Sequence, residues 1–468
     1  MKTTRPAAAC DATRRVAAAS LRTATLFAFV LLFSLPLSRA ARAQDTDRTD
    51  PQMTNTTAPV YVIRNARIVT VSGADIEGGS VVISQGRISA VGANVSAPAG
   101  AQEIDARGLT VYPGMIDLGT NMGLLEVPSV GATADMQELG EINPNISAVW
   151  SINPSSTHIA VTRVGGVTSV LSMPSGGTIS GQAAFINLAG SSPREMAVVP
   201  EAALVVQFPT LGGGGGFAAF LAQQQGITPD AVTARDRRIE ELRRLLRDAE
   251  AYGRAQDAYR KDPKSVPRPK PDLKLAALVP YARGERPVIF RAEREREIRA
   301  VVRFADEMKL KAVIIGGSDA WKAASLLKEK NVPVILDSVL NLPLREDDAY
   351  DTLYENAAKL QAAGVAFCIS TGDSGAHVRD LPFQAGMAAA YGLPKTEALK
   401  AVTLYPAQIM GVASQMGSIE QGKLANLFIT DGDPLEPHTN IKYLFINGRQ
   451  IPLVSRHTML NDEFKDRK

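Results

Sequence analysis

Histidine and cysteine, the side chains that most often hold transition metals or act as bases and nucleophiles near neutral pH, are few in this chain of 468 residues. It has four histidines and two cysteines: His158, His377, His438, His457, Cys10 and Cys368. Cys368 lies in the apolar run Val-Ala-Phe-Cys-Ile, which predicts a buried, unreactive thiol. His377 follows the last predicted strand and is the candidate for a functional histidine, with an ordinary surface histidine as the alternative.

Several common chemistries lack their motifs. No Gly-x-Ser-x-Gly elbow occurs, and His377 is the only candidate base for a serine nucleophile. The glycine run at residues 212–216 is not followed by the Lys-Ser/Thr pair of a phosphate loop. Lys+Arg number 51 against 48 Asp+Glu, a net charge of +3. This balance gives no support for nucleic-acid binding.

A glycine-rich segment follows the second predicted strand. Residues 172–182 read Ser-Met-Pro-Ser-Gly-Gly-Thr-Ile-Ser-Gly-Gln. Such a backbone can approach a ligand closely and offer its N–H groups to an anion or a carbonyl. We therefore expect a small-molecule ligand and take five residues as candidate substrate-binding positions, with a plain turn as the alternative. They are Ser175, Gly176, Gly177, Gln182 and His377.

The elements that must position these residues alternate between strands and helices. Eight strands are predicted at residues 111–118, 167–173, 183–188, 203–207, 287–290, 311–315, 333–336 and 366–370. Several are short, continuous and apolar, as expected of strands covered on both faces. Helices predicted at 295–309, 321–330 and 353–363 follow three of them. The pattern predicts an α/β fold with a TIM-like (β/α)8 barrel over residues 111–411.

Both ends of the chain carry short strands separated by glycine turns. We expect residues 59–110 and 412–468 to form one small β-sandwich, with the barrel inserted between them. Residues 229–272 form a charged helical insertion, in which Ile239, Leu242, Leu246 and Ala249 make one apolar stripe. A surface helix is expected there.

The N-terminus has the features of an export signal. A basic segment is followed by a short apolar run and by Ala-Arg-Ala at residues 41–43. We expect residues 1–43 to be a cleaved signal peptide and residues 44–58 a flexible lead-in, so that the protein is secreted or periplasmic. An uncleaved anchor is the alternative, although the run is short for a membrane span. Cys10 leaves with the signal, so no internal disulfide is expected.

Five segments resemble one known family in order and spacing. They are Ile-Arg-Asn-Ala-Arg-Ile-Val-Thr at 63–70, Gly-Arg-Ile-Ser-Ala-Val-Gly at 86–92, Tyr-Pro-Gly-Met-Ile-Asp at 112–117, Glu-Ala-Leu-Lys-Ala-Val-Thr at 397–403 and Gly-Ser-Ile-Glu-Gln-Gly-Lys-Leu-Ala-Asn at 417–426. The chain resembles the amidohydrolase superfamily, in particular its imidazolonepropionase-like and cyclic-amidohydrolase branch. The resemblance implies a metal-dependent barrel beside a composite β-sandwich. It also implies hydrolysis of non-peptide C–N bonds, as in cyclic amides and ureides, by a metal-activated water.

The metal-ligand positions implied by the resemblance are not histidines here. The first-strand pair reads Gly119 and Asn121, and the sixth-strand position reads Gly316. The fifth-strand position reads Arg291, with Glu293 two residues later, whereas the last-strand aspartate, the candidate base, is matched by Asp373. Arg291 is always cationic and cannot ligate a metal. We expect it to pair with Asp373 or Glu293, or else to point into solvent near the rim.

Carboxylates elsewhere offer a different metal site. Glu126, Asp135, Glu138 and Glu141 follow the first predicted strand. Together with Asp117, Glu293 and Asp373 they could form an all-oxygen site for Mg²⁺, Mn²⁺ or Ca²⁺. The alternative is an acidic loop in solvent. Such a carboxylate-bound divalent ion is the only cofactor that these residues indicate.

Three hypotheses for the function follow. The first is a secreted amidohydrolase-like hydrolase whose site is rebuilt with carboxylates or works without metal. The second is a catalytically silent pseudo-hydrolase that binds a ligand, or that acts as an oligomer or as the partner of an active paralogue. The third is an enzyme of another class on the same barrel, because a fold does not determine its function.

Overall fold

The computed structural model describes residues 59–209, 231–337, 339–372 and 374–467. The predicted signal peptide (1–43), the lead-in (44–58), the glycine run 212–216 and Asp373 lie outside the described residues. Within the described ranges, no helix is both long and apolar enough to cross a membrane.

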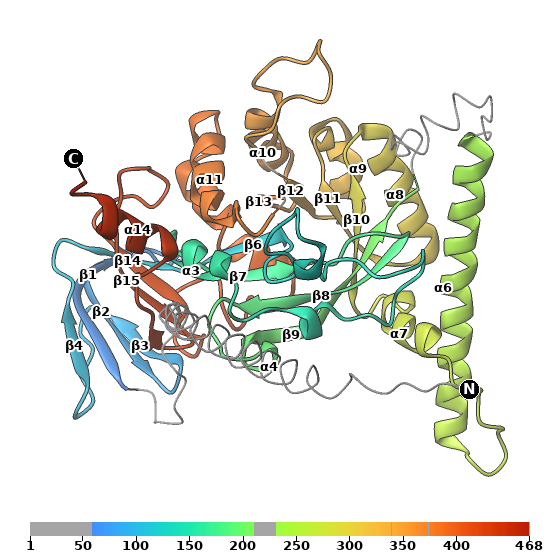
Figure 1. The fold of residues 1–468 in the computed structure, drawn as a ribbon, viewed down its shortest axis with the longest axis horizontal. Coiled ribbons are helices and arrows are strands. Elements are labelled where there is room, and N and C mark those ends of the chain that lie inside the picture. The colour runs from blue at the N-terminus through green and yellow to red at the C-terminus, as the bar shows by residue number, and fades with distance from the viewer. Residues whose placement is uncertain (1–58, 210–230, 338, 373, 468) are drawn as a thin grey trace, which may run out of the picture. The chain divides into compact units, whose positions relative to one another are not determined.

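Eight strands form a nearly closed barrel sheet (Figure 1). In sheet order, which here is also chain order, they are β6 (Met115–Thr120), β7 (Val167–Ser172), β8 (Ile179–Asn187), β9 (Ala197–Gln207), β10 (Pro287–Ala292), β11 (Lys311–Gly316), β12 (Val334–Asp337) and β13 (Phe367–Ser370). The first and last strands meet where Ser370 Oγ donates to Asp117 Oδ1 at 2.8 Å. The predicted TIM-like α/β barrel is confirmed.

The third strand corrects one detail of that prediction. β8 runs antiparallel to both β7 and β9, whereas the other neighbouring pairs of the sheet are parallel. Residues 173–178 alone join β7 to β8. A parallel connection needs a crossover of about a dozen residues or more, so this link can only reverse the chain.

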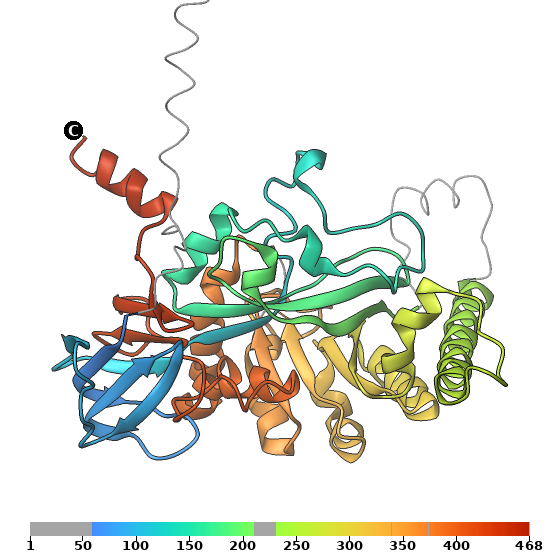
Figure 2. The same ribbon diagram turned by 90° about the horizontal axis from the view of Figure 1, so that it is seen from below.

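Two layers of apolar side chains stabilise the barrel, one inside the sheet and one between the sheet and the surrounding helices. Its interior is filled by side chains such as Phe185, Ile289 and Ile335. Helices that follow the later strands lie on the lower side in Figure 2: α8 (Glu295–Met308), α9 (Ala324–Glu329) and α10 (Thr352–Ala363). The other helices around the barrel are α3 (Thr157–Arg163), α4 (Pro193–Met196), α7 (Leu273–Ala282), α11 (Leu381–Ala390), α12 (Lys395–Ala401) and α13 (Leu404–Ile409), with short 3₁₀ turns η1 (Gly131–Thr133), η2 (Ala148–Ser151), η3 (Ala320–Ala323) and η4 (Val378–Asp380). In α8, Ile298, Val301 and Val302 are buried at helical spacing.

The two chain ends build a second sheet, at the left of Figure 1. Its order is β16-β15-β14-β5-β1-β2-β3, with β4 paired to β1. The strands are β1 (Tyr61–Ile68), β2 (Ile76–Ser84), β3 (Arg87–Gly92), β4 (Gln102–Asp105), β5 (Thr110–Pro113), β14 (Leu427–Thr430), β15 (Ile441–Ile446) and β16 (Arg449–Gln450). The single strand predicted at 111–118 is wrong: it breaks at Gly114, where a Cβ would lie 2.1 Å from Thr168 Oγ1. A last helix, α14 (Arg456–Phe464), was not predicted.

Buried amides join the terminal sheet to the barrel. Asn426 Nδ2 donates to Asn187 Oδ1 at 2.8 Å, and Asn187 Nδ2 donates to Asn447 Oδ1 at 2.8 Å. Asn447 N–H returns a bond to Asn426 Oδ1. Because each amide satisfies the next, this network fixes β8 against the turn before β16.

The insertion folds as the long helix α6 (Ala231–Lys261), at the right of Figure 1. Leu242, Leu246 and Ala249 are buried on its inner face. Arg243 Nε lies 2.8 Å from Glu307 Oε1 of α8. Apolar packing and this ion pair together hold the helix on the side of the barrel.

Candidate functional site at the barrel mouth

The barrel strands deliver polar side chains to one end of the sheet. Asp117 lies on β6, Arg291 on β10, Asp337 at the end of β12 and Ser370 at the end of β13. Because these strands run in the same direction, their carboxyl ends form a common rim, where barrel enzymes place their active sites. We call this rim the barrel mouth.

An arginine lies between two carboxylates at the mouth. Arg291 Nη1 donates to Asp337 Oδ2 at 2.6 Å and lies 3.6 Å from Glu293 Oε1. Glu293 also accepts a hydrogen bond of 2.8 Å from Ser318 Oγ. The predicted pairing of Arg291 with Glu293 is therefore present, and Asp337 is a further partner. These contacts hold the guanidinium in one orientation.

Burial controls the charge of Asp337. Its side chain is only 9% exposed, against 37% for Arg291. Burial raises the pKa of the Asp337 carboxyl to about 6, and repulsion by Glu293 and Asp117 adds to the rise, whereas the Arg291 guanidinium opposes it. The pKa of Asp337 therefore lies about two units above that of an ordinary aspartate, and its charge changes near pH 6.

Asp117 connects the first barrel strand, β6, to the end of the last, β13. It is fully buried and accepts hydrogen bonds from Gly119 N–H at 2.8 Å, from Ser370 Oγ at 2.8 Å, and from the N–H and Oγ1 of Thr371 at 3.1 and 2.5 Å. Burial raises the pKa of Asp117, and these bonds oppose the rise. With this many donors around it, Asp117 serves mainly to join β6 to β13.

Neighbouring side chains fill the space beside the glycines at the mouth. A Cβ on Gly119 would lie 2.1 Å from Ser370 Oγ, and one on Gly316 would lie 2.3 Å from Glu293 Oε1. A Cβ on Gly372 would lie 1.0 Å from an oxygen of Asp337. A larger residue at any of these positions would therefore displace a member of the polar network. Asn121 accepts a bond of 2.8 Å from Gly375 N–H.

A small cavity of about 160 Å³ opens at the mouth. Its polar lining comes from Thr120, Asn121, Ser175, Gln207 and Arg291, and its apolar lining from Met136, Met173, Pro174, Val205 and Ile315, with Gly119 and Gly372 completing the wall. Asp337 and Glu293, the partners of Arg291, are not among the lining residues. The cavity is smaller than the ~300–1,000 Å³ typical of drug-sized ligands.

The predicted substrate-binding residues do not all reach this cavity. Ser175 lines it. Gly176 and Gly177 pack against the loop of residues 137–141, where a Cβ would lie 2.5 Å from Gln137 or 2.8 Å from the carbonyl oxygen of Glu141. His377 is exposed and lies outside the lining, just before η4. Of these four residues, therefore, only Ser175 is placed for ligand contact.

The prediction for Gln182 is corrected. Its side chain is buried and donates to the carbonyl oxygen of Pro144 at 2.9 Å. Its Oε1 accepts from the Tyr281 hydroxyl at 2.7 Å. Since both ends of the amide are engaged, Gln182 joins β8 to α7 and has a structural role.

The carboxylates that follow β6 do not converge. Asp135, Glu138 and Glu141 are exposed, and Glu126 is half-buried. Among the described residues, no group of three or more His, Cys, Asp or Glu side chains is arranged to hold a metal ion. The described members of the predicted all-oxygen site are therefore not assembled, because their loop turns them into solvent; its remaining member, Asp373, lies outside the described ranges.

Several polar residues of the site were missed from the sequence, among them Thr120, which ends β6. Asp337 directly follows the apolar residues 334–336, and Gln207 ends β9. A polar residue at the carboxyl end of an apolar strand was the available signal. Its meaning depends on which strands share a rim, which the sequence does not state.

Known proteins share this architecture. The model of the Amidohydrolase family matches residues 294–451. The structure of an amidohydrolase from Thermotoga maritima MSB8 has 26% identity and a TM-score of 0.73, covering 85% of this chain and 100% of its own. The C-terminal part of the chain therefore matches the Amidohydrolase family, and its fold is that of an amidohydrolase. No curated protein sequence matches it.

Two further solved structures share the fold at lower identity. A Xaa-Pro dipeptidase with bound methionine has 15% identity and a TM-score of 0.51, covering 84% of this chain and 99% of its own. Molinate hydrolase has 15% identity and a TM-score of 0.52, covering 85% of this chain and 95% of its own. At this identity, the two likenesses concern the fold alone.

Proposed function

We propose that this chain is a secreted amidohydrolase-superfamily protein whose barrel mouth binds a small neutral amide or ureide, with Arg291 in place of the superfamily's histidine-held metal. The observation that carries the proposal is that Arg291 lines the cavity while its partners Asp337 and Glu293 do not. Secretion is supported by the basic, apolar and Ala-Arg-Ala segments of residues 1–43.

The residues at the mouth do not fit the superfamily's metal. Arg291 is a permanent cation without a lone pair, so it would repel a divalent ion. Gly119 and Gly316 carry no donor, and Ser370 and Glu293 occupy the space that a larger side chain would need. No chemical step is therefore assigned to a metal here.

The charge balance favours a neutral ligand over an anion. The positive charge of Arg291 is already matched by Asp337 at 2.6 Å and faced by Glu293 at 3.6 Å. A second anion at the guanidinium would therefore meet carboxylates close behind it. A carbonyl oxygen accepts the same N–H donors without that repulsion, and Ser175, Asn121 and Gln207 can bond the remaining polar atoms of an amide.

Binding is tested by calorimetric titration of the full chain with cyclic amides and ureides. We expect a ring-sized neutral amide to bind, Arg291→Ala to abolish binding, and Gln207→Leu to weaken it about tenfold, because one polar partner is lost. Binding that survives Arg291→Ala unchanged would contradict the proposal.

Hydrolysis of the bound C–N bond is a second candidate function. Among the described lining residues there is no carboxylate or imidazole. Asp373, the superfamily's base by resemblance, directly follows the lining residue Gly372 in the sequence. If Asp373 is the base, Asp373→Asn abolishes turnover and leaves ligand affinity within about twofold. If wild type binds amides without turning them over, the chain is the catalytically silent relative.

A further inference from the structure

A buried aspartate joins three segments that follow the barrel strands. Asp319 lies just after β11, and its side chain is only 2% exposed. Its backbone N–H donates to the carbonyl oxygen of Glu293, which follows β10, at 2.9 Å. Its carboxylate accepts hydrogen bonds of 2.8 and 3.4 Å from Arg345, which lies between β12 and α10. The segments after β10, β11 and β12 therefore meet at this one residue.

Two cations keep this buried carboxylate charged. Burial alone would raise the pKa of Asp319, but hydrogen bonds from Arg345 and Lys322 outweigh burial and lower the pKa. Lys322 Nζ lies 2.8 Å from Asp319 Oδ1. Both carboxylate oxygens face the Arg345 guanidinium, and such a two-pronged contact fixes direction as well as distance.

The segment held by Asp319 in turn holds the side chain of Glu293. Ser318 directly precedes Asp319, and its Oγ donates to Glu293 Oε2 at 2.8 Å. The other carboxylate oxygen, Glu293 Oε1, lies 3.6 Å from Arg291 Nη1 at the mouth. The contacts of Asp319 therefore reach the residue that lines the mouth cavity.

We propose that Asp319 and Ser318 set the charge preference of the mouth, as positioning residues that keep the Glu293 carboxylate facing Arg291. A carboxylate at this place repels an anionic ligand and leaves a neutral carbonyl group unaffected. Without the bond from Ser318, Glu293 is free to turn toward solvent, to which its side chain is already 32% exposed. The mouth then accepts an anion more readily. The inference rests on the proposed binding of amides at Arg291.

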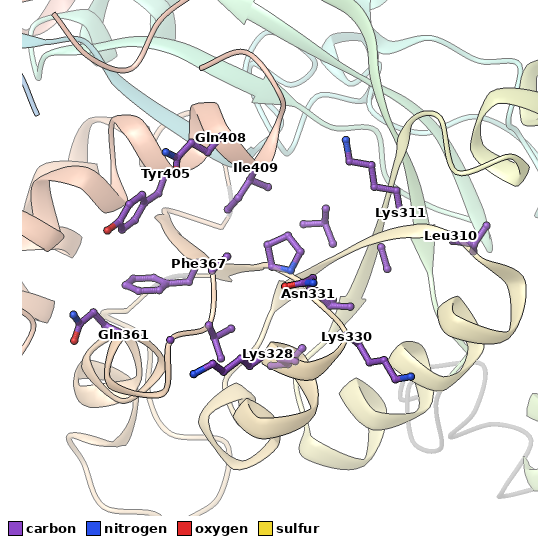
Figure 3. Close-up of a pocket in the computed structure, with 18 of the residues that line it drawn as sticks. Leu310, Lys311, Lys328, Lys330, Asn331, Gln361, Phe367, Tyr405, Gln408 and Ile409 are labelled. Atoms are coloured by element: carbon purple, nitrogen blue, oxygen red, sulfur yellow. The ribbon is translucent and has the colours of Figure 1, made fainter. Parts of the chain in front are cut away.

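A larger cavity offers a second place where a probe can bind. It has a volume of about 720 Å³ and lies at the amino ends of β11 and β13, away from the mouth (Figure 3). Its lysines Lys311 and Lys328 point apart, so they do not form one site for an anion (Figure 3). Ala366 lines this cavity and not the mouth. Ala366→Trp therefore distinguishes binding there from binding at Arg291.

The test compares two ligands of the same shape. Cyclopentanecarboxamide is neutral, and cyclopentanecarboxylate carries a charged oxygen in place of the amide nitrogen. In calorimetric titrations of the full chain at pH 8, both wild type and Ala366→Trp should bind the carboxamide more tightly. Ser318→Ala and Asp319→Asn should each tighten carboxylate binding about three- to fivefold and keep carboxamide affinity within about twofold. A general loss of packing would not change the ratio of the two affinities in this direction.

Matched variants separate positioning from other effects. Glu293→Gln removes the carboxylate itself and should give the largest gain in carboxylate affinity. Arg345→Met should give part of that gain and Arg345→Lys less, because lysine keeps a positive charge beside Asp319. Asp348→Asn removes a second carboxylate bonded to Arg345, at 3.3 Å, and should leave the ratio unchanged. Circular dichroism confirms folding, and Ser318→Ala tests the same link if Asp319→Asn does not fold.

Two results would overturn the inference while amide binding at the mouth stands. The first is an unchanged ratio of affinities in folded Ser318→Ala when Glu293→Gln changes it. The second is equal binding of the two ligands by wild type. If wild type binds neither ligand, or if Ala366→Trp abolishes the binding of both, the proposed function fails together with this inference.

Discussion

Arg291 Nη1 lies 2.6 Å from Asp337 Oδ2, although the two residues are 46 positions apart in the chain. β10 and β12 are separated by β11 in the sheet, so the pair spans one strand at the barrel mouth. This contact places a fixed cation where the superfamily resemblance implies a metal ligand.

Removal of the cation should cost stability in a pH-dependent way. Arg291→Met leaves Asp337 buried without its partner, so we expect a loss of about 2–3 kcal/mol in the free energy of unfolding at pH 8. The loss should be smaller at pH 5, where Asp337, with its pKa raised to about 6, is largely protonated. Urea unfolding at both pH values measures the difference. Arg64→Met, which breaks an exposed pair with Glu103, should cost less than about 1 kcal/mol at either pH.

Asp337 should also leave a signature in the wild-type pH profile. Its pKa is about 6 in the folded protein against a reference of 3.8, so between these values the folded state binds the proton more strongly than the unfolded state. Stability from this group therefore falls as pH rises from about 4 to 6, by up to about 3 kcal/mol at ~1.4 kcal/mol per pKa unit, and is then constant. Asp337→Asn should flatten that slope. An unchanged slope in the variant would show that Asp337 does not titrate there.

Gly316, at the end of β11, should not tolerate a larger residue, because the side chain of Glu293 occupies the adjacent space. Gly316→Ala introduces a Cβ 2.3 Å from Glu293 Oε1 at a φ of +104°. We expect a loss of about 2–4 kcal/mol, of which ~1–2 kcal/mol reflects backbone strain alone. Gly422→Ala has a φ of +90° and open space around its Cβ, so it should show only the strain. In the Gly316→Ala background, Glu293→Ala should restore the part of the stability that is lost to the steric clash, as measured by thermal or urea unfolding. If it restores none, the steric explanation is contradicted.

The hydrogen bonds of Gln182 should contribute to the free energy of unfolding and not to ligand affinity. Tyr281→Phe removes the hydroxyl that donates to Gln182 Oε1 at 2.7 Å and leaves a buried acceptor unpaired. We expect a loss of about 1–2 kcal/mol in the free energy of unfolding, with amide affinity at the mouth unchanged. A large loss of affinity without a loss of stability would indicate that Gln182 takes part in ligand binding after all.

The sequence predicts the strands of this fold better than the contacts of its site. Continuous apolar runs such as 312–315 and 366–369 mark strands, and the apolar stripe of α8 marks its inner face. The antiparallel direction of β8 was missed because an apolar run has no direction. Asp337 and the bonds of Gln182 were missed because their partners lie 46, 38 and 99 residues away. Such contacts depend on how the strands are ordered, which local patterns do not encode.

The most direct test of the central claim, that Arg291 replaces a metal at the barrel mouth, is elemental analysis of the purified protein. The full chain is dialysed against zinc-containing and then metal-free buffer, and zinc per chain is measured beside the Arg291→His with Glu293→His variant. We predict no stoichiometric zinc in either, since Gly119, Asn121 and Gly316 would still provide no imidazole. Two tightly held zinc ions per wild-type chain would contradict the account.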